Sequence, residues 1–218
     1  MDSSSPLKYT SLFILIDGFR GCNLLNSDIR DLIHKNENLI EDFYIGGTLS
    51  DRCSILIRKI DTFREDNKIG SQEQKSDLKI TLITYSMGGA LAAKLISELR
   101  DIGKIKFFID TTVLISPDTK SIPNGEGDDA YIESLELFGE LESPIDNFIE
   151  LLKESRLSYC FYNPLDSMVP YRNNVDELVC TNINGFTPIM EKFSGVNNHQ
   201  EILNRPKVKK RIVTVLSE

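Results

Sequence analysis

A serine in a glycine-rich turn, within residues 84–89, is the residue of this chain best placed to do chemistry. Apolar residues 80–83 precede the turn and a helix-like run follows it. A strand, a tight turn and a helix with Ser86 at the apex would expose a hydroxyl that can attack a carbonyl carbon. Gly88 supplies a small neighbour for a strained turn, and Gly89 lets the helix approach the strand closely. A serine that only caps a glycine-rich helix start is the alternative interpretation.

A nucleophilic serine needs a general base, and the chain contains two histidines. His34 lies in a charged helical run near the N-terminus, where a solvated surface position is expected. His199 lies in a polar loop that runs into the last helical region, and catalytic groups concentrate on such loops. We therefore predict that His199 is the base. A surface histidine at a helix start is the alternative.

The acid that orients this histidine is expected between the serine and the histidine in the chain. Asp166 lies in a turn after apolar residues 157–162. Asp118, just past an expected strand at 112–117, is the rival, because some hydrolases place the acid there. Asp166 is favoured because its segment matches more positions of the pattern described next. A turn aspartate that only caps backbone amides is the alternative reading of that residue.

Four blocks of the chain, taken together, resemble the alpha/beta-hydrolase superfamily on its lipase, esterase and thioesterase side. Residues 12–21 resemble a first-strand block that usually reads His-Gly-Phe-x-Gly, and the serine turn follows. Residues 166–170 and the segment around His199 come next in the expected order. The blocks span residues 12 to about 203, nearly the whole chain. The resemblance implies the alpha/beta-hydrolase fold: a mostly parallel central sheet, helices on both faces, and a small helical insert or lid.

Two positions depart from this pattern. Asp17 stands where the superfamily often has histidine, and Thr84 stands where it often has glycine. Asp17 would oppose oxyanion formation if its charge pointed inward. Thr84 is β-branched, which suits a strand, and its side chain would crowd the turn.

The resemblance also implies a mechanism, acyl transfer from an ester or thioester to Ser86. His199 would accept the hydroxyl proton, and Asp166 would orient the imidazole and stabilise the imidazolium. The backbone amides of Phe19 and Met87 would hold the oxyanion. This chemistry requires no metal and no organic cofactor, and the sequence shows no cluster of metal-binding spacing.

Composition favours one intracellular domain over residues 1–218. The net charge of −8 argues against nucleic-acid binding. The first residues lack the apolar core of a signal peptide, and no run approaches the roughly 20 apolar residues of a membrane span. The four cysteines show no CxxC spacing, so we expect free thiols in a reducing compartment and a cytoplasmic location. They are Cys22, Cys53, Cys160 and Cys180.

Apolar periodicity predicts alternating strands and helices, which favours an open, mostly parallel sheet. We expect Ser50 to cap the second helix and Pro206 to break the last helical region and restart it. The predicted strands are 10–16, 40–45, 80–85, 109–115, 158–162 and 180–185. The predicted helices are 27–36, 50–64, 87–101, 131–139, 145–155 and 199–216.

Residues 118–156 are expected to set substrate choice, as a lid or cap insert over the serine. Apolar residues recur there at helical intervals between acids, and Leu135, Phe138, Phe148 and Leu152 could line an acyl pocket. The acidity of this segment argues against anionic substrates and acidic membranes. An ordinary surface helix packed on the sheet is the alternative.

Three function classes remain open after these observations. The first is a serine hydrolase that cleaves a small-molecule carboxylic ester or thioester, and the sequence favours it. The second is a ligand-binding or sensor protein of the same fold with little or no turnover. The third is an acyltransferase, in which an alcohol or amine replaces water. Fold alone does not decide among them.

Overall fold

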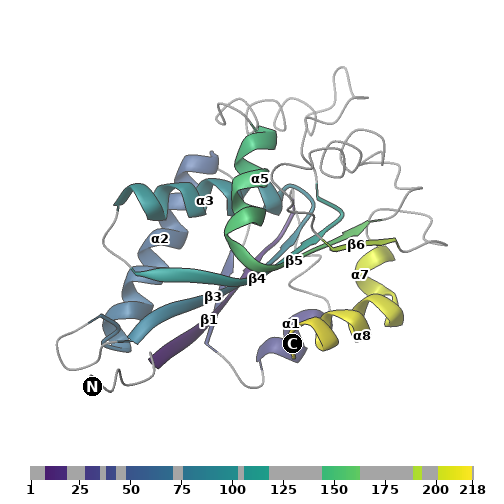
Figure 1. Ribbon diagram of the computed structural model, residues 1–218, viewed down its shortest axis with the longest axis horizontal. Coiled ribbons are helices and arrows are strands. Elements are labelled where there is room, and N and C mark those ends of the chain that lie inside the picture. Colours follow the sequence, from purple (N-terminus) through teal and green to yellow (C-terminus); the bar gives the residue numbers. More distant parts are fainter. Residues whose placement is uncertain are drawn as a thin grey trace, which may run out of the picture.

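Six parallel strands form the central sheet, in the spatial order β2-β1-β3-β4-β5-β6 (Figure 1). The computed structural model describes residues 8–18, 28–34, 38–42, 48–70, 76–102, 106–117, 144–162, 189–192 and 201–217. Parallel strands covered on both faces need near-continuous apolar runs, and the central strands have them. The strands are β1 (Lys8–Ile16), β2 (Leu39–Asp42), β3 (Ser76–Tyr85), β4 (Phe107–Ile115), β5 (Ser155–Tyr162) and β6 (Ile189–Lys192).

Helices cover both faces of this sheet (Figure 1). The chain passes from β1 outward to β2 and then returns across β1 to β3. Because crossovers between parallel strands are right-handed, this reversal of direction places α1 on the opposite face from α2, α3 and α5. The last helices, α7 and α8, share the face of α1. The bounds are α1 (Asp28–His34), α2 (Leu49–Asp66), α3 (Gly88–Ile102), α5 (Pro144–Glu154), α7 (Glu201–Asn204) and α8 (Pro206–Val215).

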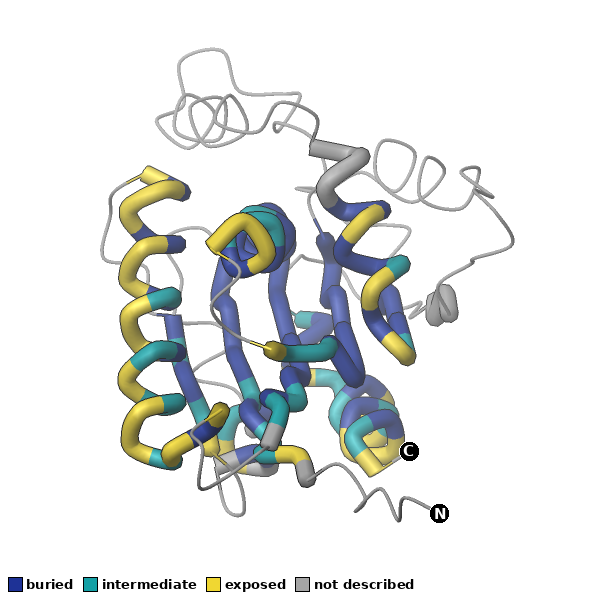
Figure 2. Tube along the Cα trace, turned by 60° about the vertical axis from the view of Figure 1, so that its left-hand side comes forward, coloured by how far each residue is buried: buried dark blue, intermediate teal, exposed yellow. Residues whose placement is uncertain are grey.

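Two apolar layers result, one on each face of the sheet. The first layer lies under α2, α3 and α5, and the second lies under α1, α7 and α8. The strands between them are buried along most of their length (Figure 2). Alternation along β3 divides its side chains, so that Leu82 joins the first layer and Ile83 the second.

A β-bulge interrupts this alternation in β4. Ile80 of β3 pairs with Ile109, but the next residue, Thr81, pairs with Thr111, so Asp110 is the extra residue. The bulge reverses the alternation, and Ile109 and Leu114 therefore both reach the first layer although they are five positions apart.

Asp110, the bulge residue, is held between two cations from the neighbouring strands. Arg156 Nε donates to its Oδ1 at 2.7 Å, and Lys79 Nζ lies 3.1 Å from its Oδ2. Burial acts to raise the pKa of Asp110, but the hydrogen bonds from Arg156 and Lys79 outweigh burial and hold that pKa below its usual value. The carboxylate therefore stays charged at neutral pH and ties β3, β4 and β5 together.

The predicted strands 10–16, 80–85, 109–115 and 158–162 are confirmed, and each extends two to four residues further at its amino end. The restart of the last helical region is also confirmed, because α7 ends at Asn204 and Pro206 is the first residue of α8. The predicted strand 180–185 and helix 131–139 lie outside the described residues, and the sixth strand is Ile189–Lys192.

The prediction that Ser50 caps the second helix is wrong. The N-cap is Thr48, whose Oγ1 accepts a hydrogen bond from Asp51 N at 3.1 Å, while Asp51 Oδ2 accepts one from Thr48 N at 3.2 Å. This reciprocal capping box satisfies two amides at once, and it starts α2 at Leu49 with Ser50 inside the first turn.

None of the described helices has the length and apolar character that crossing a membrane would require.

Candidate active site

The candidate site lies at the carboxyl ends of β1 and β3. These two strands are neighbours, and the path of the chain reverses between them, from β1 to the sheet edge and back to β3. Open parallel sheets bind ligands in the crevice at such a switch point. Asp17 and Gly18 follow β1 there, and Ser86 follows β3.

Ser86 occupies the strained turn that the sequence predicts. Its φ is +52°, a left-handed conformation that few residues other than glycine adopt. Its amide donates to the carbonyl oxygen of Ile115 in β4 at 2.9 Å, and its own carbonyl accepts from the Gly89 amide at 3.2 Å. The turn is therefore fixed to β4 on one side and to the first turn of α3 on the other. Strained backbone of this kind is concentrated at functional sites.

Close packing between α3 and β1 leaves no room for a side chain at Gly88. A Cβ atom there would lie 2.4 Å from the carbonyl oxygen of Ile16 and 2.7 Å from that of Asp17. Gly18 is equally restricted, because its Cβ would lie 2.9 Å from Cβ of Ser86. The ends of the two strands are thus in direct contact, with Ser86 between them.

Thr84 is accommodated by the glycine five positions further along the chain. Its side chain is fully buried, and Oγ1 would lie 3.7 Å from a Cβ at Gly89, an ordinary contact distance. The same Cβ would lie 2.8 Å from the ring of Phe148 on α5. Gly89 therefore leaves space for both larger side chains. The Thr84 hydroxyl has no hydrogen-bond partner among the described residues.

The backbone amide of Met87 differs from its neighbours in its hydrogen bonding. Three neighbouring amides donate hydrogen bonds to backbone carbonyls. The Ser86 amide donates to Ile115, the Gly89 amide to Ser86, and the Ala90 amide to Met87. Within the described part of the chain, the Met87 amide makes no hydrogen bond. It also precedes the N-terminus of α3, where the helix dipole favours negative charge.

Asp17 turns part of its carboxylate toward its own backbone. The side chain is fully buried, and Oδ1 accepts a hydrogen bond from the Gly18 amide at 2.7 Å. The Gly18 amide is therefore committed within the protein and is not a donor to a substrate.

Ser116 is a second strained serine, and sequence analysis did not find it. It follows β4 with a φ of +44°, and its amide donates to the carbonyl oxygen of Phe161 in β5 at 2.7 Å. Its hydroxyl is buried and has no partner among the described residues. Unlike the turn at Ser86, the segment around Ser116 carries no glycine-rich motif, so this turn was not predicted.

The other predicted site residues divide into two groups. Phe148 and Leu152 lie in the first apolar layer, where α5 packs against α3, and their role in an acyl pocket stays a prediction. The remaining predicted residues, and the rival acid, lie outside the described residues. They are Phe19, Leu135, Phe138, Asp166, His199 and Asp118.

The described cysteines offer no competing nucleophile. Cys53 and Cys160 are free, as predicted, and both are buried. Burial raises the pKa of Cys160 to about 12, and burial, with the nearby Glu98, raises that of Cys53. Both thiols therefore stay protonated at neutral pH. Among the described residues, no group of three His, Cys, Asp or Glu side chains could hold a metal ion.

Substitution of Gly88 should test the backbone contact. We expect Gly88→Ala to lower the free energy of unfolding by about 2–3 kcal/mol, because its Cβ would meet two backbone carbonyls that cannot rotate away. Gly89→Ala is the matched control and should change it by about 1 kcal/mol or less, since the ring of Phe148 can shift and alanine favours a helix. Urea unfolding followed by circular dichroism measures both. Equal effects would contradict this account.

Substitution of Thr84 should test its orphan hydroxyl. Thr84→Val should stabilise the protein by up to about 1 kcal/mol, because it removes a buried group without a partner. Thr112→Val is the control, because the Thr112 hydroxyl has a partner. The single hydroxyl proton of Ser155 is donated to the Leu151 carbonyl oxygen, so in the 2.7 Å bond between Thr112 Oγ1 and Ser155 Oγ the threonine is the donor. Losing that bond should destabilise by about 1 kcal/mol. The same unfolding measurement decides, and a destabilised Thr84→Val would contradict the prediction.

Comparison with known proteins identifies the fold. No family model matches the chain, and no curated protein matches it. It is similar to esterase B of Lactobacillus rhamnosis, with a TM-score of 0.64 at 17% identity over 96% of this chain and 74% of that one. An esterase of Pyrococcus furiosus gives a TM-score of 0.61 at 16% identity, over 96% of this chain and 83% of that one. An alpha/beta hydrolase from the metagenome of lagoon sediments at Mar Chica, Morocco, gives a TM-score of 0.55 at 10% identity. That match covers 95% of this chain and 90% of the other chain. The chain therefore has the alpha/beta-hydrolase fold, as its four sequence blocks predicted.

Proposed function

We propose that this chain is a serine hydrolase that cleaves a carboxylic ester or thioester through an acyl-serine intermediate. The observation that carries the proposal is the left-handed backbone of Ser86 at the switch point of the sheet. A capping serine needs no such strain, since N-cap residues have ordinary extended backbone. A nucleophile does, because the sharp turn lifts its hydroxyl away from both the strand and the helix.

In the proposed mechanism, Ser86 Oγ attacks the carbonyl carbon while His199 accepts the hydroxyl proton. The electron pair of the C=O double bond moves to oxygen, and the amides of Met87 and Phe19 stabilise that oxyanion. The intermediate collapses, the bond to the alcohol or thiol breaks, and His199 returns the proton to the leaving group. Asp166 holds the imidazole in the required tautomer and stabilises its cation.

Water then releases the acyl group. His199 takes a proton from water as the water oxygen attacks the acyl-serine carbonyl, and the bond to Ser86 Oγ breaks in the collapse. The proton passes to Ser86, and a carboxylic acid leaves. Every proton in this cycle is carried by side chains of the chain or by water, so the mechanism uses no metal or organic cofactor.

Three further observations support the proposal. The Met87 amide is unused by the described residues, which suits an oxyanion donor. Asp17 directs Oδ1 to the Gly18 amide, so part of its carboxylate is already bound within the protein. The structural neighbours include esterases, and esterase B has been solved with a tributyrin phosphonate.

The proposal also assigns substrate choice to the insert at residues 118–156. Its last part, α5, packs on α3 beside Gly89, so the insert ends next to the nucleophile turn. Leu135 and Phe138 are the apolar side chains that we assign to contact with the acyl group.

Removal of the serine hydroxyl should abolish activity. We expect Ser86→Ala to lose fluorophosphonate labelling and to lower hydrolysis of p-nitrophenyl butyrate by about 10³-fold or more. Ser116→Ala is the matched control, because Ser116 is also a buried serine with positive φ at the end of a strand. It should keep most of its labelling. A folded wild-type protein that does not label, or a labelled Ser86→Ala, would contradict the hydrolase proposal.

Two aspartates compete for the role of the acid. We expect Asp166→Asn to lower the turnover number by about 10³–10⁴-fold, because the imidazole would lose the partner that fixes its tautomer. Asp118→Asn should lower it by much less. Steady-state turnover of p-nitrophenyl butyrate measures both, with His199→Ala as the reference for a lost base. A larger effect at Asp118 would move the acid to the turn after β4.

A further inference from the structure

The edge of the sheet at β2 presents backbone groups that pair with no other described strand. Among the described strands, β2 pairs only with β1, in the parallel register that places Phe13 opposite Leu39 and Leu15 opposite Glu41. The amide of Phe13 donates to the carbonyl oxygen of Asn38 at 2.8 Å. In a parallel ladder such a residue bonds to the neighbours of the residue opposite it. Leu39 and Glu41 therefore turn their own N–H and C=O groups away from β1.

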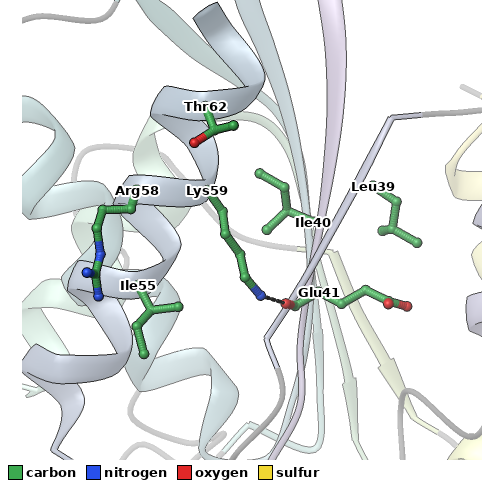
Figure 3. Close-up of a pocket in the computed structure, with 7 residues that line it drawn as sticks. All are labelled: Leu39, Ile40, Glu41, Ile55, Arg58, Lys59 and Thr62. Atoms are coloured by element: carbon green, nitrogen blue, oxygen red, sulfur yellow. Dashed lines mark hydrogen bonds between the residues drawn. The ribbon is translucent and has the colours of Figure 1, made fainter. Parts of the chain in front are cut away.

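A contact from α2 confirms this orientation. Lys59 reaches across from the helix, and its Nζ donates to the carbonyl oxygen of Glu41 at 2.6 Å (Figure 3). This carbonyl could not accept that bond if it faced β1. The outward N–H groups of Leu39 and Glu41 and the Leu39 carbonyl remain at the edge.

A groove of about 480 Å³ runs between this edge and α2. Apolar and basic side chains line it, and Lys59 extends from α2 toward Glu41 (Figure 3). The residues are Leu39, Ile40 and Glu41 from β2, and Ile55, Arg58, Lys59 and Thr62 from α2. Ile55 is 40% exposed, which is unusual for an isoleucine on a packed helix.

The charge of this groove is opposite to that of the whole chain. Neither Arg58 nor Lys59 has a carboxylate partner among the described residues, and each donates only to a backbone carbonyl, of Ser54 and Glu41 respectively. The Glu41 carboxylate is neutralised by Arg30 on α1, which donates to it through both Nε and Nη2. A locally positive groove therefore lies on a chain whose net charge is −8.

We propose that the β2 edge binds an acidic, extended segment of a partner protein, which adds to the sheet as a further parallel or antiparallel strand. Backbone groups of Leu39 and Glu41 supply the main-chain hydrogen bonds, and the groove supplies selectivity. Apolar side chains of the segment contact Ile55, and its carboxylates meet Arg58 and Lys59. A second copy of this chain is disfavoured as the occupant, because two such copies would bring their cations together. The proposal does not depend on the chemistry at Ser86.

The binding test uses a fluorescein-labelled peptide of six residues in which glutamate and valine alternate. Fluorescence anisotropy with the full chain should show saturable binding that weakens at high salt, because the attraction between exposed charges is screened. A peptide with lysine in place of glutamate should not bind. An acidic peptide N-methylated at alternate residues, so that its strand-pairing N–H groups are blocked, should bind at least about tenfold more weakly.

A charge reversal in the groove should separate local from overall electrostatics. Arg58→Glu should weaken binding of the acidic peptide by at least about tenfold. The matched control is Lys207→Glu, which makes the same change in net charge at an exposed position on α8 and should leave affinity within about twofold. Both positions are exposed, so neither variant is expected to disturb folding.

Amide hydrogen exchange gives the decisive readout. Addition of the acidic peptide should slow exchange at Leu39 and Glu41 and leave Ile40 and Asp42 unchanged, because only the first two face the open edge. The proposal would be overturned by binding without that alternating pattern of exchange, or by no binding at about 1 mM peptide. An equal loss of peptide affinity in Arg58→Glu and Lys207→Glu would also overturn it. Protection at Leu39 and Glu41 that rises with protein concentration in the absence of peptide would overturn it in favour of a second copy.

Discussion

The contact between the start of α3 and the end of β1 is the constraint on which the candidate site depends. At Gly88, the helix backbone approaches the carbonyl oxygens of Ile16 and Asp17 so closely that a single added carbon would overlap them. This approach forces the chain to turn sharply after β3, and Ser86 absorbs the turn with a left-handed backbone. In the same turn, the Met87 amide makes no hydrogen bond to the other described residues. Strain at Ser86 and an amide that the described residues leave unused at Met87 thus occur in the same turn.

The architecture of the sheet explains why this contact falls where it does. Because the first crossover runs to the edge strand β2 and the second returns across β1, the ends of β1 and β3 meet where the chain changes direction. The bulge at Asp110 lies toward the opposite end of the sheet, where β4 begins. It lets β4 place Leu114 in the first layer near the site while Asp110 binds cations from both neighbouring strands.

Local features of the sequence predicted much of this structure. The apolar runs of β1, β3, β4 and β5 and the break at Pro206 were predictable, since burial and the fixed φ of proline act locally. The cap of α2 was not, because Thr48 and Ser50 are both good capping residues, and the reciprocal bond to Asp51 decides between them.

Features that depend on the whole fold were harder to predict. Nothing in the residue types of β4 marks Asp110 as a bulge, because register depends on both neighbouring strands. Phe148 has helical periodicity whether its face meets a ligand or α3, and only the packed structure places it in the core. Pairing of Ser86 with the predicted Asp166 and His199 depends on how distant segments meet, which neither periodicity nor spacing reveals.

The distribution of steric constraint has a consequence for sequence divergence in this fold. At Gly88 an added Cβ would lie 2.4 Å from a backbone carbonyl oxygen, so almost no other residue fits there, whereas the added Cβ at Gly89 meets a ring that can shift. Most of the core requires only an apolar side chain of suitable volume, and many combinations satisfy that requirement. A chain can therefore exchange most of its residues and retain the backbone turn at Ser86. Neighbours with 10–17% identity that still align over 95% or more of the chain are the expected result. A search keyed to positions where backbone contacts exclude a side chain should therefore detect this fold better than overall identity does.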